Sequence, residues 1–117
     1  MNIDTTLASA ILSQTGLTPY PLQKPEEVNP AVVYRRISDR VTDNALEGLG
    51  HHHNVRFQIT HVHTSYAGLR TLVNNVRTAI TTISSAPAVE TTIQLENKEA
   101  DGIYVSIKDY FIFFKDI

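Results

Sequence analysis

Cysteine is absent from the 117 residues, which excludes disulfides and thiolate zinc sites. No run approaches the roughly 18 apolar residues of a membrane-spanning helix, so no membrane association is expected. The first sixteen residues, MNIDTTLASAILSQTG, lack the basic start and apolar core of a signal peptide. A basic excess is missing too, because the formal net charge is −2. Nucleic-acid binding is therefore not expected, since it depends on clustered cations.

The residues that are present describe a small globular protein. Hydrophobic residues make up 42% of the chain and charged residues 19%, which is typical of a chain that folds around a core. The length suits one ordinary domain. We therefore expect a single domain that covers residues 1–117.

Hydrophobic periodicity predicts an α+β fold, with two helices on a largely antiparallel sheet of four strands and room for a fifth. The predicted elements are a helix from Asp4 or Thr5 to about Gln14, strands at Ala31–Ser38 and Val55–His63, a helix from Thr64 or Ser65 to Ile83, and strands at Val89–Asn97 and Ile103–Lys115. The order is thus α-β-β-α-β-β. Four of the five prolines lie between the first helix and the first strand, which predicts an extended surface connection there.

Two segments break the simple pattern. Residues Asp39–His53 are polar, contain Gly48 and Gly50 and show no sustained period, so they are expected to form a long loop. In the last strand the alternation is clear up to Ile107 and then blurs at Asp109. Either a β-bulge near Asp109 or burial of both faces beyond it would produce this blur.

The five histidines form the most conspicuous cluster of titratable residues. They lie between His51 and His63, and imidazoles in such number can bind zinc, nickel or copper. Adjacent residues in an extended segment point to opposite sides, however, so the spacing is poor for one shared metal. We interpret His51–His53 as solvated loop residues and His61 as the end of the core face. No metal site is expected.

No catalytic motif is visible in the chain. A nucleophile elbow, a glycine-rich phosphate loop and an HExxH sequence are all missing. The acidic residues around 96–101 fall in an expected exposed turn, where paired carboxylates lack the environment that separates their pKa values. The sequence therefore predicts neither an enzyme nor a cofactor.

Aromatic residues are concentrated in the last strand, on both of its faces, which favours burial of both faces. A partner subunit could cover the second face, because aromatic residues are enriched at interface centres; a corner within one subunit could also do so. Arg35 and Arg36 could pair with a neighbouring subunit or extend at the sheet edge. The candidate inter-subunit contacts are Arg35, Arg36, Tyr110, Phe111, Phe113 and Phe114.

The whole layout resembles the tail completion, or tail terminator, family of long-tailed phages. An N-terminal helix leads to YPLQKPEEVNPAVVYRRIS, a polar loop precedes VRFQITHVHTSYAGLRTLVNNVRTAI, and the chain closes on YFIFF. The resemblance spans about residues 5–115. The residues that carry it are Tyr20, Pro21, Leu22, Val32–Tyr34, Ser38, Arg56, Gln58, Ala67, Leu69, Val73 and Ile80.

The resemblance implies a structural virion protein at the head-proximal end of the tail, assembled in the host cytoplasm. Its partners would be copies of itself in a hexameric ring, the tail tube protein and the head-tail connector protein, with DNA passing through the lumen without specific binding. The triple histidine matches no feature of the family. We hypothesise that the long loop orders against tube or connector through Asp43, Asn44, Leu46, Glu47, Leu49, His51, His52 and His53. The alternatives are another connector, stopper or tail morphogenesis protein, or a histidine-rich metal-binding module.

Overall fold

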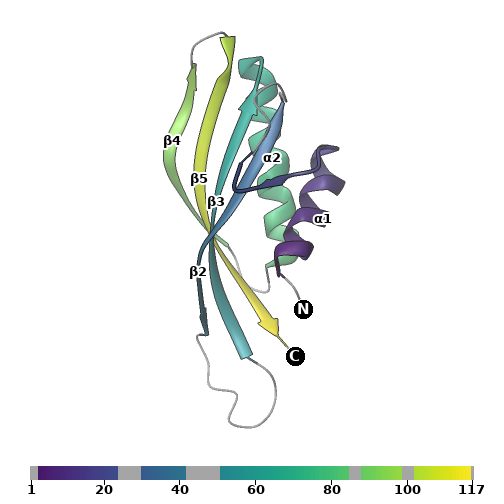
Figure 1. The fold of residues 1–117 in the computed structure, drawn as a ribbon, viewed down its shortest axis with the longest axis vertical. Helices are drawn as coiled ribbons and strands as arrows, with labels where there is room; N and C mark the ends of the chain where they lie inside the picture. The colour runs from purple at the N-terminus through teal and green to yellow at the C-terminus, as the bar shows by residue number, and fades with distance from the viewer. Residues whose placement is uncertain (1–2, 24–29, 42–50, 85–87, 99–101, 117) are drawn as a thin grey trace.

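The computed structural model describes residues 3–23, 30–41, 51–84, 88–98 and 102–116. Within them the chain forms two helices and five strands (Figure 1). In chain order these are α1 (Ile3–Thr15), β1 (Tyr20–Pro21), β2 (Ala31–Val41), β3 (His51–His63), α2 (Tyr66–Ile83), β4 (Val89–Lys98) and β5 (Tyr104–Asp116). The predicted α+β class and the order of the predicted elements are confirmed.

Helix α2 follows the sequence prediction most closely. The Ser65 side chain caps its start by accepting a hydrogen bond of 3.0 Å from the Gly68 amide, as an N-cap should. Ser84 ends the helix in an extended conformation, and its amide still donates to the Ile80 carbonyl. One buried stripe faces the sheet along the helix, formed by Leu69, Leu72, Val73, Val76, Ala79 and Ile80.

The sheet has the strand order β1-β2-β3-β5-β4. All neighbouring pairs are antiparallel except β1 and β2, which run parallel through Tyr20–Val33 and Pro21–Tyr34. The sheet is therefore mixed, and its fifth strand comes from the proline-rich connection. Proline lacks an amide donor and is confined to edge strands, and Pro21 lies at the edge of this sheet.

The predicted loop 39–53 is shorter than expected. Its first residues belong to β2, which continues to Val41, and its last residues belong to β3, which begins at His51. Asp39 pairs with Val55, and His53 pairs with both Val41 and Phe114. Backbone pairing on both sides of β3 thus overrides the weak strand preference of a polar segment. Residues 42–50 lie outside the described part of the chain.

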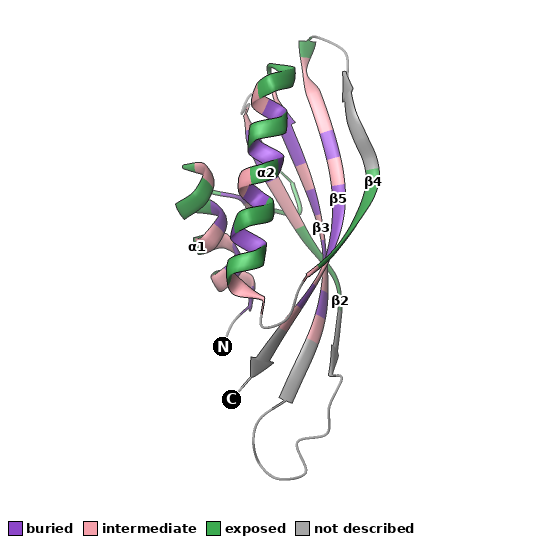
Figure 2. Cartoon of the chain, turned by 180° about the vertical axis from the view of Figure 1, so that it is seen from behind, coloured by how far each residue is buried: buried purple, intermediate pink, exposed green. Residues whose placement is uncertain are grey.

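Both described helices lie on the same face of the sheet (Figures 1 and 2). The core between the layers joins Leu7 and Ile11 of α1 to α2 and to the inward side chains of Val55, Phe57 and Ile59 on β3, all of them fully buried. This face of the sheet is called the helix face below, and the opposite one the open face. Neither described helix is long and apolar enough to cross a membrane.

The blurred alternation in the last strand does not come from a bulge in the pairing of β5 with β3. Strand β5 pairs with β3 in continuous register from Tyr104 to Asp116. The register shifts lie instead in the pairing of β4 with β5, between Thr92 and Gln94 and between Gln94 and Asn97. Asp109 therefore keeps the alternation and points to the open face.

Candidate functional site

The helices leave the open face of the sheet uncovered (Figures 1 and 2). Side chains paired across strands point to the same side, so the register assigns each residue to a face. The described residues of the open face are Ala31, Val33, Arg35, Ser38, Asn54, Arg56, Gln58, Thr60, Val62, Val89, Thr91, Val105, Ile107, Asp109, Phe111 and Phe113. Half of them are apolar, and no described helix or strand lies over them (Figures 1 and 2).

An ion pair lies in the middle of this face. Asp109 is only 2% exposed, and its Oδ2 accepts hydrogen bonds from Nε of Arg56, at 2.9 Å, and from Nη2 of the same residue. The guanidinium of Arg56 also lies 5.8 Å from the ring centre of Phe111, which suits a cation–π contact. Oδ1 of Asp109 is buried without a hydrogen-bond partner among the described residues.

The candidate aromatic contacts separate between the two faces. Phe111 and Phe113 are half-buried on the open face. Tyr110 points the other way and lies in the core of a single subunit, 1% exposed. Its side chain therefore has no surface to offer to another subunit. The side chain of Phe114 lies outside the described part. Contact with a partner subunit stays a prediction for Phe111 and Phe113.

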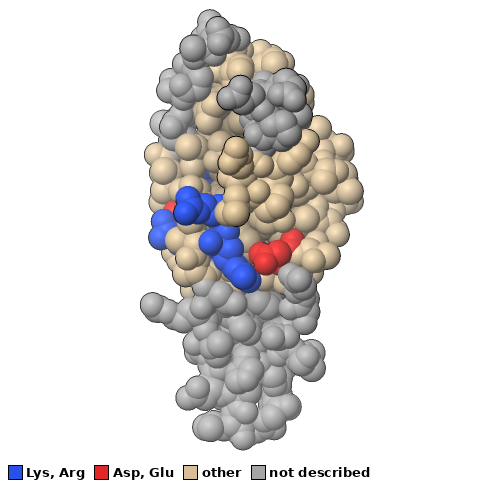
Figure 3. Space-filling view, viewed as in Figure 1, with Lys and Arg blue, Asp and Glu red and all other residues tan. Residues whose placement is uncertain are grey.

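The two candidate arginines also point to opposite faces. Arg36 lies on the helix face, where its Nη1 is 3.4 Å from Oδ2 of Asp4 in α1. Arg35 lies on the open face, is exposed and makes no ion pair within the described residues. Basic side chains gather over β2, with acidic groups beside them (Figure 3). Arg35 is thus the candidate arginine with its charge available.

The histidines do not form a metal centre in the described part of the chain, where no group of three or more His, Asp or Glu side chains could hold an ion. His61 ends the core face as expected and is fully buried. Its Nδ1 lies 3.0 Å from the Ser106 carbonyl oxygen, so this nitrogen carries the proton and donates it. His63 lies against Gly68, where any Cβ would overlap its ring. The side chains of His51–His53 lie outside the described part.

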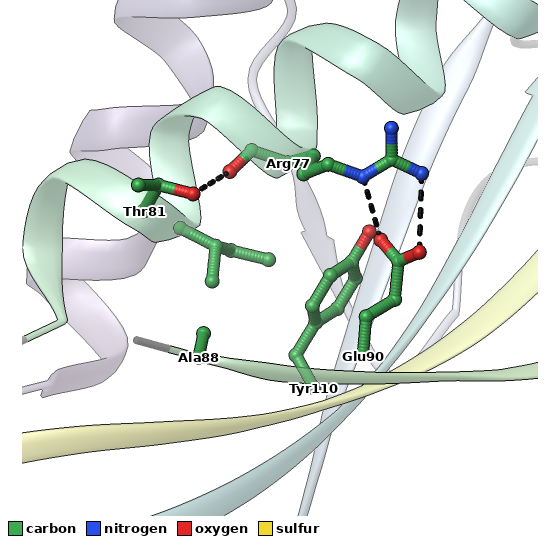
Figure 4. A pocket seen from close by; sticks show the side chains of 6 residues that line it. Arg77, Thr81, Ala88, Glu90 and Tyr110 are labelled. Carbon is green, nitrogen blue, oxygen red and sulfur yellow. Dashed lines mark hydrogen bonds and ion pairs between the residues drawn. The ribbon is translucent and has the colours of Figure 1, made fainter. Parts of the chain in front are cut away.

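A layer of charged side chains between α2 and the sheet was not expected from the sequence. Arg77 of α2 donates two hydrogen bonds to the Glu90 carboxylate on β4, at 2.8 and 3.1 Å. Lys108 of β5 approaches the same carboxylate at 3.4 Å and donates to the Thr92 hydroxyl at 3.0 Å. The Tyr110 hydroxyl points toward this group (Figure 4). The sequence signal that could have revealed this layer is Lys108, a charged residue within a mostly apolar strand.

Arg77 and Glu90 line a cleft of about 260 Å³ between α2 and the start of β4. Burial opposes ionisation of Glu90, but the hydrogen bonds from Arg77, the nearby Tyr110 hydroxyl and the charge of Lys108 outweigh it and lower its pKa to about 2. Burial and the neighbouring carboxylate raise the pKa of Tyr110. Arg77 and Lys108 both contact the Glu90 carboxylate, so these charges form a structural network.

The exposed large hydrophobic side chains of the sheet lie at its two edges, next to β1 and β2 on one side and on β4 on the other. Leu22, just after β1, is 71% exposed and Ile37 of β2 is 40% exposed. At the other edge of the sheet, Val89 and Ile93 of β4 are each 50% exposed. The central strands β3 and β5 carry no such residue in their described parts. Together with the open face, these edges are the surfaces that favour contact with another protein.

Comparisons with known proteins add little to this description. No family model matches the chain, and no curated protein matches it. Among solved structures, the chain is similar to one from the virion of a native gene transfer agent particle. The match covers 89% of this chain and 84% of that chain, with a TM-score of 0.44 and 11% sequence identity. A likeness this remote carries no argument about function.

Proposed function

We propose that this chain is a structural virion protein that works as a tail terminator. Copies of it form a homo-hexameric ring on the head-proximal end of the tail tube. The ring ends tube polymerisation and presents its other side to the head-tail connector protein. DNA passes through the lumen without specific binding. The role is mechanical, so the protein has no catalytic residues and needs no cofactor.

The open face of the sheet is the observation that carries the proposal of an assembly role. A soluble subunit that works alone seldom leaves a sheet face this apolar without a covering layer. Here Phe111, Phe113 and Ile107 remain half-buried on a face that neither described helix covers, and further apolar residues are exposed at both edges of the sheet. Such surfaces gain free energy when another protein covers them.

The sequence resemblance narrows this assembly role to a tail terminator. The residues that carry the resemblance are distributed through both layers of the fold. Val32, Leu69, Val73 and Ile80 are buried, whereas Leu22 and Ser38 are exposed. A resemblance that includes core and surface residues alike supports a shared fold.

Electron microscopy of purified tails tests the proposed position. With the protein labelled by a bound antibody fragment, we expect a single ring at the head-proximal tip of each tail. Tails from a virus that lacks the protein should have tubes of uncontrolled length and no attached heads. Label along the whole tube would indicate a tube subunit, and label on the head side of separated particles would indicate a connector protein; either result contradicts the proposal.

Deletion of Asn44–Gly50 tests the proposed role of the loop between β2 and β3. This segment lies outside the described residues, and it connects the ends of two paired strands. The shortened protein should keep its circular dichroism spectrum and its ring, because none of the described core residues is removed. Heads and tails should then accumulate separately. Normal joining would show that tube and connector are recognised elsewhere.

A further inference from the structure

We propose that β4 is a detachable edge strand, held on the fold by the charged layer around Glu90, and that its release uncovers the edge of β5. Among the described strands, β4 pairs with β5 alone and lies at one edge of the sheet (Figure 1). When β4 opens, the amides and carbonyls of β5 that pair with it become free. Such groups are where a sheet accepts a further strand. This device is a property of the single subunit and is independent of the proposed ring.

Strand β4 contributes no side chain to the core within the described residues. All of its described side chains, Val89–Ile93, are exposed. The buried core cluster takes its members from both helices and from β2, β3 and β5. Strand β2, near the opposite edge, supplies the fully buried Val32. Release of β4 therefore withdraws none of these residues from the core, and burial of apolar surface is what holds the other strands in place.

The backbone pairing of β4 is also interrupted. Its register with β5 is regular over Val89–Thr92, and it then shifts between Thr92 and Gln94 and again between Gln94 and Asn97. Strand β5 pairs with β3 in continuous register over all of its 13 residues. Each shift disrupts the ladder of hydrogen bonds locally. Strand β4 is therefore paired less firmly than the central strands beside it.

The charged layer fastens β4 to α2 and to β5. Arg77 of α2 donates two hydrogen bonds to the Glu90 carboxylate, at 2.8 and 3.1 Å. Lys108 of β5 lies 3.4 Å from the same carboxylate and donates to the Thr92 hydroxyl at 3.0 Å. The cleft of about 260 Å³ lies beside these contacts, so apolar packing does not fill the junction between α2 and the start of β4. Glu90 thus connects β4 to both of its neighbours.

An ion pair of this kind is a latch that opens at low cost. The side chains of Arg77 and Glu90 are 46% and 27% exposed, so water already reaches the pair and solvates both groups once they separate. Regions with few buried contacts open locally, without unfolding of the whole chain. The other described strands keep both helices and the core cluster, so they form the unit that stays folded.

Hydrogen exchange of the full chain, followed by mass spectrometry at urea concentrations below the unfolding transition, tests this opening. Amides of β4 should exchange through an opening that responds weakly to urea, because the urea slope reports the surface that becomes exposed. Amides of β3 should exchange through global unfolding, with a steep slope. Equal rates and equal slopes in both strands would overturn the proposal, because β4 would then open only with the whole fold.

Arg77→Met tests the latch from the side of α2. Exchange of the β4 amides should accelerate about three- to fivefold, as for an exposed bidentate pair. The β3 amides should accelerate by the same factor, because the pair is lost in both openings. Glu90→Gln removes the charge that Arg77 and Lys108 share, so it should accelerate β4 at least as much. Unchanged β4 exchange in either variant would overturn the role of these charges.

Arg36→Met is the matched control. The Arg36 side chain is also 46% exposed, and it pairs with Asp4 of α1 rather than with β4. Its ion pair survives the opening of β4 and is lost only in global unfolding. The β4 amides should therefore exchange at the wild-type rate, whatever happens to the β3 amides. Faster β4 exchange in Arg36→Met would show that β4 opens together with the helix layer, which contradicts a strand that detaches alone.

Discussion

Acidification from pH 7 to pH 4 should reduce the free energy of unfolding by about 3 kcal/mol through His61 alone. The side chain is fully buried on the helix face, under α2. Burial lowers its pKa from 6.5 to about 4, and the charges of Lys108 and Arg77 act in the same direction. The hydrogen bond to Ser106 and the charge of Glu90 oppose the shift but do not cancel it.

The direction in which the free energy of unfolding changes with pH follows from which state binds the proton. Between pH 6.5 and pH 4 the unfolded chain carries a protonated His61, whereas the folded chain keeps it neutral. Proton uptake on unfolding makes stability rise with pH across this window. The stability is therefore complete above about pH 6.5 and is lost as the pH falls toward 4. Glu90, with its pKa lowered to about 2, adds a separate loss that begins near pH 4.5.

Urea unfolding at a series of pH values measures this loss, and His61→Gln isolates it. Glutamine can still donate to the Ser106 carbonyl, but it does not titrate. The variant should therefore lose most of the stability change between pH 6.5 and 4.5. An unchanged slope in His61→Gln would show that the buried imidazole does not control acid unfolding.

The elements with a strong local period are the ones that the sequence predicts well. Helix α2 combines a capping serine with a buried stripe, and β3 alternates through Val55, Phe57 and Ile59. In both, local preference and tertiary burial agree. The strand ends near Val41 and His51 lack such a signal. Their pairing follows from the neighbouring strands, which a local pattern does not encode.

The faces of β4 and β5 show what alternation alone leaves open. Val105 and Ile107 alternate with Ser106 and Lys108, which suggests that the apolar pair faces the core. The structure does the reverse, because Tyr110 and Ile112 enter the core further along the same strand. A strand has a period of two, so burial of these two residues also turns Ser106 and Lys108 inward. The apolar residues of the open face follow from this one choice.

The charged layer around Glu90 could not be predicted for a related reason. Arg77 and Glu90 lie 13 residues apart on two elements of different type, α2 and β4, and neither shows a local pattern that predicts the contact. They meet because α2 lies over the sheet and β4 occupies the edge beside β5. The opposite orientation of the two candidate arginines was easier to predict, because strand alternation alone requires Arg35 and Arg36 to face opposite sides of the sheet.

Arg56→Met should reduce the free energy of unfolding by about 3 kcal/mol. Asp109 is buried, and Arg56 supplies both hydrogen bonds to its Oδ2. Loss of the guanidinium leaves a carboxylate in a low-dielectric site without compensation, which typically costs about 3–5 kcal/mol. The Arg56 side chain is 37% exposed, so water reaches part of the pair and the lower end of this range is expected. The methionine keeps much of the contact with Phe111.

Arg77→Met is the control that separates burial from the mere loss of an ion pair. Arg77 also bonds a carboxylate twice, but its side chain is 46% exposed and that of Glu90 is 27% exposed. An exposed pair is worth about 0–1 kcal/mol, so this variant should lose far less stability. The double variant Arg56→Met/Asp109→Leu should recover most of the loss, because no buried charge then remains. Equal losses of unfolding free energy in Arg56→Met and Arg77→Met would mean that water reaches the ion pair on the open face as readily as the exposed pair between α2 and β4. The apolar character assigned to the open face would then be wrong.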